Sequence, residues 1–584
     1  MAFNYSTNQN VQILVALLKE HGIRNIIASP GTTNLELVVS LQHDKFFNMY
    51  SCVDERSAAY MACGLATVTG EPVVITCTEA TASRDYYPGL TEAYHRKLPV
   101  LAVTGLHDYR FVGHLEPQVI DRSVSPVDSM KKKINLCVIK DENDYNNSIL
   151  KINEALLELK RRDYGPVHIN IPWNGGNFNF SVTELPKVRK IERFFFDQDL
   201  PPIKARKIAV LIGGHGDWSE DRAKALDGFC STYNAIAICD HTSKYYGKYR
   251  AQCTMIAAQK VKSEILANIE LLIHIGEEFG DDTTKKELMQ VGEVWRVSPD
   301  GELRDTFGKL TKVFEMPEKF FFASYTKKER GNDSYINDYS KEIQSIENNI
   351  PQLPFSSIYL AQQMSKKLPA GSMLHLGPSD SVRAWNYFRL RDGVKSRFNS
   401  GCRGIDGCVS ALIGASLADP SKLYFGVVGD LTFFYDMNAL GNRHVQNNVR
   451  LMVVNNDGGN IFRHNGHATQ VWLGYENTNK YVAAGGHFGK QSHSLLKHYA
   501  EDLGFEYLSA TNKDEFDHAL EKFTSSKKNP KPIVFEVFTE SKNDSNAFDL
   551  MGSILLDSKG QAKAVVKSIL GEQGTAFMKK IIKK

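Results

Sequence analysis

Several features that would decide the class of a protein are missing from this chain of 584 residues. It has no apolar run of about 18 residues, which a membrane-spanning helix would need. Its first stretch, MAFNYSTNQNVQILVALLKEHG, is polar before a short amphipathic helix and lacks the charged-then-apolar pattern of a secretion signal. The formal net charge of +3 gives no excess of one sign that would favour nucleic acid as a partner. We therefore expect a cytoplasmic protein that binds neither membranes nor nucleic acid.

Paired cysteines are also missing. None of the nine cysteines forms a CxxC pair, and most lie in apolar surroundings. A zinc site is therefore a poor interpretation, and buried free thiols in a reducing compartment are the better one. Cysteines of this kind include Cys52, Cys63, Cys77, Cys402 and Cys408.

The residues that are present follow an α/β pattern. The chain is 42% apolar and 23% charged, as in ordinary globular proteins, and it is too long for one core. Short runs rich in Val and Ile alternate with helical segments, and such unbroken apolar strands predict parallel sheets covered by helices on both faces. The runs are IRNIIASPG, PVVITC, LPVLAVTG and GPVHINIP, then IAVLIGG, AIAICD and LLIHIG, then KLYFGVVGD and RLMVVNNDGG.

Two polar stretches divide this pattern into three blocks. The first is TELPKVRKIERFFFDQDLPPIKARK and the second is YTKKERGNDSYINDYSKEIQSIENN. We predict three doubly wound parallel-sheet domains at 1–182, 183–352 and 353–584, of which the first and third are the same kind of unit. The basic tail FMKKIIKK is expected to be a solvated helix terminus.

Polar residues follow two of the strands in the third block. KLYFGVVGD ends at Asp430. RLMVVNNDGG supplies Asn456, 26 residues after Asp430, and the carbonyl of Gly458. Carboxyl ends of parallel strands share one edge of a sheet, where ligands bind. A carboxylate, an amide oxygen and a carbonyl suit a Mg²⁺ ion that takes its other ligands from a diphosphate. Either motif alone would be read as a turn, but the two together favour the metal site.

These motifs resemble those of the thiamin diphosphate (ThDP) enzymes. The GD and NN pairs are similar to the cofactor-binding motif, with Leu431 in place of its usual glycine. CVDERSAAYMACGLA resembles the segment that carries the family's glutamate and places it at Glu55, and YGPVHINIPWN resembles the strand that closes the first domain. The resemblance implies pyrimidine-binding, middle (transhydrogenase-like) and diphosphate-binding domains, with ThDP and Mg²⁺ as cofactors. Without it, Glu55 would be read as a solvated residue in the first turn of a helix.

One branch of the family, the 2-succinyl-5-enolpyruvyl-6-hydroxy-3-cyclohexene-1-carboxylate synthases of menaquinone biosynthesis, has segments similar to GDLTFFYDMNAL, VVNNDGGNIF, GIDGCVS and ASPG. It implies a homodimer or homotetramer in which Glu55 faces the diphosphate-binding domain of the partner subunit. The implied cofactor-binding residues are Pro30, Gly31, Glu55, Ile405, Gly429, Asp430, Leu431, Asn456 and Ile461, and the implied metal ligands are Asp430, Asn456 and Gly458.

The resemblance also implies catalytic and substrate-binding residues. Glu55 would shift the cofactor's aminopyrimidine to its imino form, so that the ring can act as the base. GPSDSVRAW places substrate contacts at Ser379 and Arg383, and VGHLEPQVID places an active-site residue at Gln118. Arg403 is a further substrate residue by this resemblance. Arg383 suits a second carboxylate such as that of 2-oxoglutarate, although a surface salt bridge for Arg383 and a solvated loop for Gln118 stay open.

The chain departs from the branch on the acceptor side. The family's SPGSRS is SPGTTN here, with Thr33 in place of arginine, and His107 stands at the arginine of the family's DRP. Ser400 replaces another arginine, and Arg403 stands three places further on. Glu79 replaces a glycine. We therefore predict a paralogue with a different acceptor. No His-His pair occurs, which favours ligation over protonation.

The predicted activity is decarboxylation of a 2-oxo acid with transfer of the acyl carbanion to a carbon acceptor. Three alternatives remain open: the menaquinone-pathway synthase itself, a simple 2-oxo acid decarboxylase, and a non-catalytic ThDP-binding protein. The last is disfavoured by the presence of Glu55, which only catalysis would use.

Overall fold

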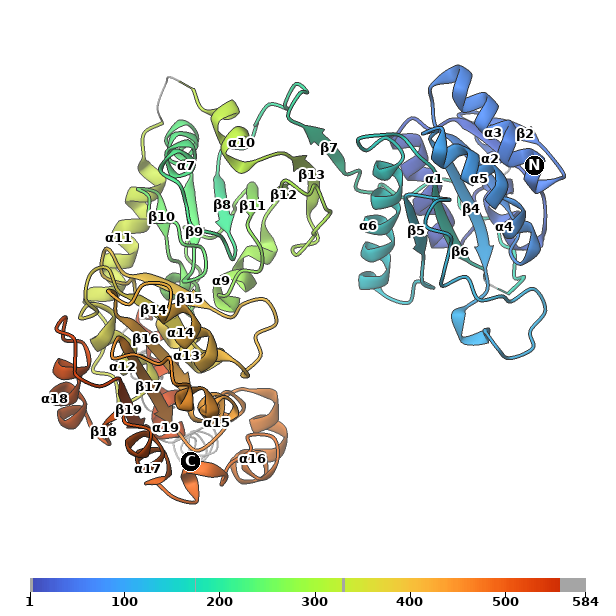
Figure 1. Ribbon diagram of the computed structural model, residues 1–584. Coiled ribbons are helices and arrows are strands. Elements are labelled where there is room, and N and C mark those ends of the chain that lie inside the picture. The colour runs from blue at the N-terminus through green and yellow to red at the C-terminus, as the bar shows by residue number, and fades with distance from the viewer. Residues whose placement is uncertain (1–3, 174, 328–330, 557–584) are drawn as a thin grey trace, which may run out of the picture. The chain divides into compact units, whose positions relative to one another are not determined.

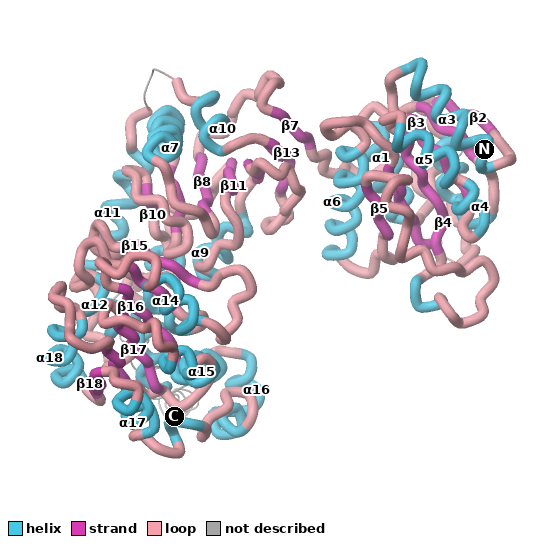
Figure 2. The backbone as a smooth tube through the Cα atoms, viewed as in Figure 1, coloured by secondary structure: helices cyan, strands magenta, loops and turns pink. Residues whose placement is uncertain are grey.

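The computed structural model describes residues 4–173, 175–327 and 331–556. It contains three parallel sheets with helices around them (Figures 1 and 2), which confirms the predicted α/β class. None of the helices in these ranges is both long enough and apolar enough to span a bilayer. The tail at 577–584 lies outside the described residues. The chain divides into two compact units, Met1–Leu200 with Asp300–Glu315, and Pro201–Pro299 with Met316–Lys584.

The first unit is built on a six-stranded sheet in the order β2-β1-β3-β4-β6-β5. Apolar side chains of α1, α2 and α6 pack with one face, and those of α3 and α5 with the other. The bounds are β1 (Asn25–Ala28), β2 (Asn48–Ser51), β3 (Val73–Cys77), β4 (Val100–Leu106), β5 (Lys132–Asn135), β6 (Val167–Pro172), α1 (Gln9–Glu20), α2 (Leu35–His43), α3 (Glu55–Thr69), α4 (Thr81–Asp85), α5 (Tyr87–His95) and α6 (Glu142–Glu158).

Small residues let α3 and α5 pack closely. The buried face of α3 contains Ala58, Ala59 and Ala62, spaced as one stripe of a helix. A Cβ atom at Gly89 of α5 would meet the Cβ of Ala59 at 2.4 Å, so only glycine fits there. This contact holds α3 against the sheet, and Glu55 is the first residue of α3.

The second sheet has seven strands in the order β10-β9-β8-β11-β12-β13-β7. Strands β7 (Glu192–Phe195) and β13 (Leu310–Glu315) count with the first unit, and the others with the second. The latter are β8 (Ile208–Ile212), β9 (Ile236–Cys239), β10 (Arg250–Ala251), β11 (Leu271–Ile275) and β12 (Glu293–Val297), with α7 (Glu220–Tyr233), α8 (Thr254–Ala257), α9 (Asp282–Glu287), α10 (Glu318–Tyr325) and α11 (Ser334–Asn348).

The third sheet, in the second unit, has the order β15-β14-β16-β17-β19-β18. The predicted domain boundaries stay predictions. The bounds are β14 (Met373–Leu376), β15 (Lys395–Phe398), β16 (Tyr424–Gly429), β17 (Val449–Asn455), β18 (Glu506–Ala510), β19 (Ile533–Phe538), α12 (Ser357–Ser365), α13 (Asp380–Trp385), α14 (Cys408–Ser416), α15 (Asp430–Tyr435), α16 (Ala468–Lys480), α17 (Leu495–Asp502), α18 (Lys513–Phe523) and α19 (Ser541–Met551).

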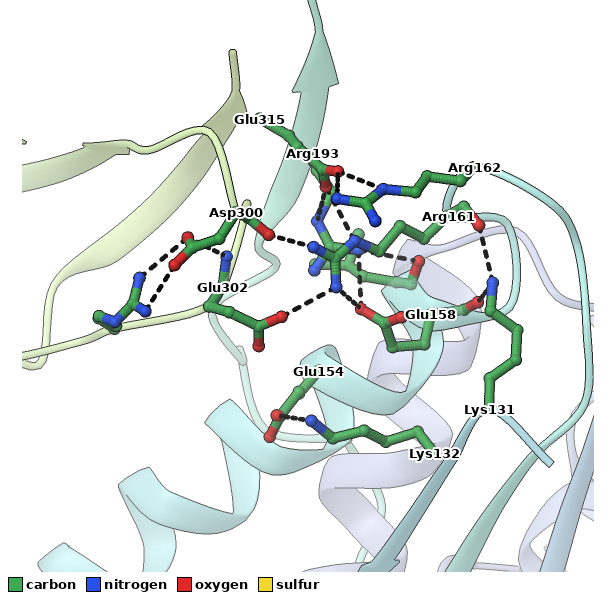
Figure 3. A network of polar contacts seen from close by, with 12 residues as sticks. Lys131, Lys132, Glu154, Glu158, Arg161, Arg162, Arg193, Asp300, Glu302 and Glu315 are labelled. Atoms are coloured by element: carbon green, nitrogen blue, oxygen red, sulfur yellow. Dashed lines mark hydrogen bonds and ion pairs between the residues drawn. The ribbon is translucent and has the colours of Figure 1, made fainter. Parts of the chain in front are cut away.

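A charged network in the first unit ties β13 to the end of α6 (Figure 3). Arg161 forms ion pairs with Glu158 at 3.0 Å, with Glu302 at 3.0 Å and with Glu315 at 2.8 Å. Arg162 reaches the other oxygen of Glu315 at 2.7 Å. The Glu315 side chain is only 6% exposed, so its charge depends on these arginines. β13 also pairs in parallel with β7, so backbone and side chains both join it to the first unit.

Candidate active site

A cavity of about 470 Å³ opens at the carboxyl edge of the third sheet. In this sheet β15 lies on one side of β14, and β16 lies on the other. The strand order therefore reverses between β14 and β16, and parallel sheets bind ligands at such a switch point. The segments after β14, β16 and β17 all reach the cavity. Its lining includes the predicted residues Ser379, Arg383, Arg403, Ile405, Gly429, Asp430, Leu431, Asn456, Gly458 and Ile461.

Asp430 begins α15 directly after β16. Its Oδ1 accepts the Leu431 N–H at 2.9 Å and its Oδ2 accepts the Gly458 N–H at 2.8 Å. Burial raises the pKa of Asp430 to about 7, and no ion pair offsets this within the described ranges. A cation at the carboxylate would restore its charged form, so the side chain suits the predicted metal.

Gly458 can only be glycine in this backbone. Its φ is +126°, outside the range open to other residues, and a Cβ atom would lie 2.4 Å from the Ala483 carbonyl oxygen. The turn brings the Gly458 N–H to Asp430. The two strand ends predicted to converge are therefore joined by a hydrogen bond.

Asn456 is oriented by a residue that the sequence did not indicate. Its Nδ2 donates to Asp544 Oδ2 at 3.2 Å, which leaves its side-chain oxygen for a cation. Asp544 belongs to α19 and is fully buried. It also accepts the Ser357 N–H at 2.6 Å and the Asn460 Nδ2 at 3.1 Å. Nothing in the local sequence around Asp544 could have identified it, because its role depends on a contact across 88 residues.

A second buried carboxylate, Asp380, lines the cavity. It accepts Asn460 Nδ2 at 2.8 Å and is paired with His464 Nε2 at 2.8 Å. Burial alone would lower the pKa of His464, but the charge of Asp380 outweighs it and raises that pKa. The Asn460 amide thus joins Asp380 to Asp544. His464 is therefore part of this network.

Of the predicted substrate residues, Ser379 lies just before α13 and Arg383 lies on it. Ser379 has a φ of +65°, a strained value for a residue with a side chain, as is found at functional sites. Arg383 is exposed on the cavity wall and makes no ion pair or hydrogen bond to the described residues. Its guanidinium is therefore available to an anionic substrate.

Arg403 is placed differently. It lines the same cavity, but its guanidinium pairs with Glu278 at 3.0 Å and with Asp282 at 2.8 Å. It also donates to the Phe279 carbonyl oxygen at 2.9 Å. A substrate contact at Arg403 stays a prediction, and it would have to compete with these two carboxylates.

Magnesium remains a prediction as well. The described residues contain no group of three His, Cys, Asp or Glu side chains that could hold a metal. The predicted ligand set does not require one, because it combines one carboxylate with an amide oxygen and a carbonyl. The orientation of Asn456 and the unpaired buried carboxylate of Asp430 fit a cation held in this way.

The remaining predicted residues lie in the first unit. Pro30 and Gly31 follow β1, at the switch point between β1 and β3, and a Cβ atom at Gly31 would meet Thr78 Cγ2 at 1.9 Å. Glu55 is half-buried and has no hydrogen bond or ion pair to the described residues. Gln118 is exposed, with a φ of +65°.

Two of the departures noted in the sequence contact each other. Glu79 is 3% exposed and forms an ion pair with His107 Nδ1. Its other oxygen accepts the His107 backbone N–H at 2.9 Å. The two unusual residues are thus one structural feature, a buried carboxylate paired with an imidazole at the ends of β3 and β4.

Comparison with known proteins identifies one domain in the first part of the chain and another in the last part. Residues 9–125 match the model described as "Thiamine pyrophosphate enzyme, N-terminal TPP binding domain", and residues 380–537 match the corresponding C-terminal TPP binding domain. A protein of Bacteroides fragilis is 31% identical over 574 residues, covering 93% of this chain and 98% of its own. The chain belongs to the thiamine pyrophosphate enzyme family.

Further members of the family match over most of the chain. A protein of Bacteroides thetaiotaomicron is 31% identical and covers 93% of this chain and 98% of its own length. One of Flavobacterium psychrophilum is 28% identical, with 91% and 96% covered. All three relatives are named 2-succinyl-5-enolpyruvyl-6-hydroxy-3-cyclohexene-1-carboxylate synthase. The resemblance seen in the sequence is confirmed, and thiamin diphosphate is the cofactor of the family.

Proposed function

We propose that this ThDP enzyme decarboxylates a 2-oxo acid and transfers the acyl carbanion to a carbon acceptor, with Mg²⁺ as the metal. The observation that carries the proposal is the cavity of the third sheet. It combines oxygen ligands at Asp430, Asn456 and Gly458 with the free guanidinium of Arg383. A metal-bound diphosphate and an anionic substrate can therefore share one space.

The residues have separate roles in this proposal. Asp430, the amide oxygen of Asn456 and the Gly458 carbonyl hold Mg²⁺, while Ile405 and Ile461 give the cofactor an apolar surface. Thiamin diphosphate, when bound, supplies a nucleophilic carbon that accepts the electrons released with CO₂. Glu55 holds a proton on the cofactor's aminopyrimidine, and its carboxylate is free of other partners among the described residues.

The donor we propose is a 2-oxo acid with a second carboxylate, such as 2-oxoglutarate. Arg383 can form two parallel hydrogen bonds to a carboxylate, and it stands three residues after Asp380, which lines the same cavity. Ser379 adds a hydroxyl at the cavity wall. A monocarboxylic donor such as pyruvate would leave Arg383 unpaired.

The acceptor separates the main proposal from its nearest alternative. The relatives carry the name of the synthase that the sequence resembles. The resemblance implies isochorismate as the acceptor of that synthase. Thr33, His107 and Ser400 stand where that branch has arginines, and His107 is in contact with Glu79. We therefore propose a different acceptor for this chain. The synthase itself, a simple decarboxylase and a non-catalytic ThDP-binding protein are the alternatives that the experiment has to exclude.

Self-association as a dimer or tetramer belongs to the same proposal. Several apolar side chains near the start of α3 are exposed on the first unit: Val53, two residues before Glu55, at 82%, and Tyr60 and Met61 at about 45%. Exposed apolar side chains gathered on one element are typical of a protein interface. We propose that the diphosphate-binding region of a second subunit covers these side chains and brings Asp430 to Glu55.

The test is CO₂ release from 2-oxoglutarate, pyruvate and related acids, with and without ThDP and Mg²⁺. Release should require both cofactors, be fastest with 2-oxoglutarate and be lost in Glu55→Gln, which should still bind ThDP. Full activity in Glu55→Gln would overturn the mechanism. Isochorismate is then added, and formation of the succinyl-cyclohexene product would identify the synthase and reject the different acceptor. No release from any acid in the presence of bound ThDP, with or without isochorismate, would contradict decarboxylation ahead of acceptor binding and would favour the non-catalytic ThDP-binding protein.

A further inference from the structure

A second cavity, of about 450 Å³, lies in the first unit where β4, β5 and β6 end. It is separate in sequence from the residues proposed for the cofactor. Its walls are mostly apolar, and one buried cation, Arg122, reaches it. The apolar lining comprises Leu106, Val112, Ile120, Leu136, Val138 and Pro172.

Arg122 is a buried charge without a counter-charge. Its side chain is 4% exposed, its Nη1 donates to Thr104 Oγ1 at 2.8 Å and its Nη2 donates to the Gly105 carbonyl oxygen. Both acceptors are neutral. The Nε has no partner, and no carboxylate lies within ion-pair distance of the guanidinium in the part of the chain that the structure describes. Buried guanidinium groups are normally paired with anions, so this site is one negative charge short.

The charges around Arg122 do not correct the imbalance. Burial lowers the pKa of Arg122, and burial together with Arg122 lowers the pKa of Lys133 to about 8, so Lys133 repels Arg122 and does not compensate it. Lys133 does not line the cavity, which leaves Arg122 as its buried cation. Lys133 donates to the Arg122 carbonyl oxygen and to Ser125 Oγ, which are again neutral. Of the nearby carboxylates, Glu79 attracts Arg122 from a distance, but both of its oxygens are held by His107.

The two carboxylates that line the cavity are also engaged. Asp108 accepts the Arg110 N–H at 3.1 Å and pairs with its guanidinium at 3.4 Å. Asp144 accepts the Lys140 N–H at 3.0 Å and lies in the first turn of α6, where a negative charge is stabilised. Neither is paired with Arg122. A dianion such as phosphate would be repelled by both, whereas one carboxylate would match the single charge at Arg122.

We propose that this cavity binds a small organic acid, with the carboxylate at Arg122 and an apolar body against the walls. The volume admits a ligand of small-molecule size. This site goes beyond the proposed function and does not depend on it. Its wall is the segment that runs from His107 to Ser123 and also carries Gln118, so binding would order a segment predicted to reach the substrate.

The test uses the full chain and a matched pair of probes, benzoate and its neutral analogue benzamide, titrated calorimetrically. Benzoate should bind saturably, and benzamide at least about tenfold more weakly. Arg122→Gln should weaken benzoate binding by about tenfold or more, while Arg122→Lys, which keeps the charge, loses less. The control is Arg110→Gln, which removes the same charge from an exposed side chain of the same segment and should change the affinity less than about twofold.

A second measurement does not depend on the variants folding. In the unsubstituted protein, benzoate should slow amide hydrogen exchange within residues 107–123 and at the ends of β4 and β6. The proposal is overturned if benzoate does not bind, if benzamide binds as tightly, if Arg122→Gln and Arg110→Gln behave alike, or if the protection falls elsewhere.

Discussion

The side chains around Asp430 hold one another through hydrogen bonds between residues far apart in the sequence. Asp430 accepts from Gly458, Asn456 donates to Asp544, and Asn460 joins Asp544 to Asp380. Each bond fixes the direction of one donor or acceptor. The cavity is therefore arranged before any ligand enters it, which lowers the cost of binding a metal and a diphosphate.

Asp544 should act as a positioning residue for the metal. In Asp544→Asn the charged acceptor of Asn456 Nδ2 is lost, so the amide oxygen is held less firmly toward a cation. The Mg²⁺ concentration for half-maximal ThDP binding should rise at least about tenfold. Tryptophan fluorescence during ThDP titrations at graded Mg²⁺ measures it. Asp549→Asn, on the same helix and bonded to Asn465, is the control; an equal change in both variants would contradict the role.

The pair of Asp380 and His464 should make stability depend on pH. The pKa of His464 is raised in the folded protein. Its contribution to the free energy of unfolding is therefore complete at a pH below about 6.5, the pKa in the unfolded chain, and is lost as the pH rises through the pKa in the folded protein. The pKa of Asp380 is lowered, so its contribution is lost only in acid. His464→Gln should cost about 3 kcal/mol near pH 6 and less near pH 9.

Thermal unfolding midpoints from pH 5.5 to 9 check this expectation. The difference between the unsubstituted protein and His464→Gln should shrink as the pH rises. Exposed His444 provides the control substitution to Gln, which should leave the profile unchanged. A difference for His464→Gln that stays constant with pH would mean that the imidazole is neutral in the folded protein.

Residue patterns predicted some of this site and could not predict the rest. Asp430, Asn456 and Gly458 stand at strand ends, and the topology of a parallel sheet brings strand ends together without further information. Asp380 and Asp544 belong to helices, where a carboxylate is ordinarily solvated. Their burial follows from how α13 and α19 pack, which no local pattern encodes. The pairing of Glu79 with His107 has no local sequence signal for the same reason, although each residue alone departs from the pattern of the family.

At the scale of elements, alternating strands and helices were predictable because buried parallel strands are unbroken apolar runs. β3 and β6 are buried along their whole length, as PVVITC and GPVHINIP indicated. The ion pairs that join β7 and β13 to the end of α6 were not predictable. Charges on separate elements carry no periodicity that would pair them.

Glu315 should be the member of that network on which stability depends. Glu315→Gln leaves Arg161, which is 11% exposed, and Arg162 without their shared carboxylate, and should cost about 3 kcal/mol. The control is Glu302→Gln, which pairs with the same Arg161 but is 41% exposed and should cost at most about 1 kcal/mol. Thermal unfolding of the two variants side by side tests this. Equal midpoints would show that burial of Glu315 adds nothing.

At the scale of the whole molecule, the two halves of the proposed site belong to different compact units. Glu55 lies in the first and Asp430 in the second. Apolar side chains of the helix that Glu55 begins, including Tyr60 and Met61, are left exposed by the chain itself. Self-association would cover them, and it would also let one subunit supply Glu55 and its partner supply Asp430.

Mixing two inactive variants distinguishes a shared site from one within a single chain. Glu55→Gln and Asp430→Ala should each abolish cofactor-dependent CO₂ release. If the site is shared, a mixed dimer has one site with both substitutions and one with neither, because a two-fold interface places the same residues on both sides. Dissociating and reassembling an equal mixture should then restore about a quarter of the unsubstituted activity, since about half of the dimers are mixed and each has one intact site. A site within one chain would restore nothing, because every chain carries a lesion.

The same mixture reassembled with Met61→Glu in both variants should also stay inactive, since a charge among these exposed apolar side chains opposes association. Light scattering would show the smaller species.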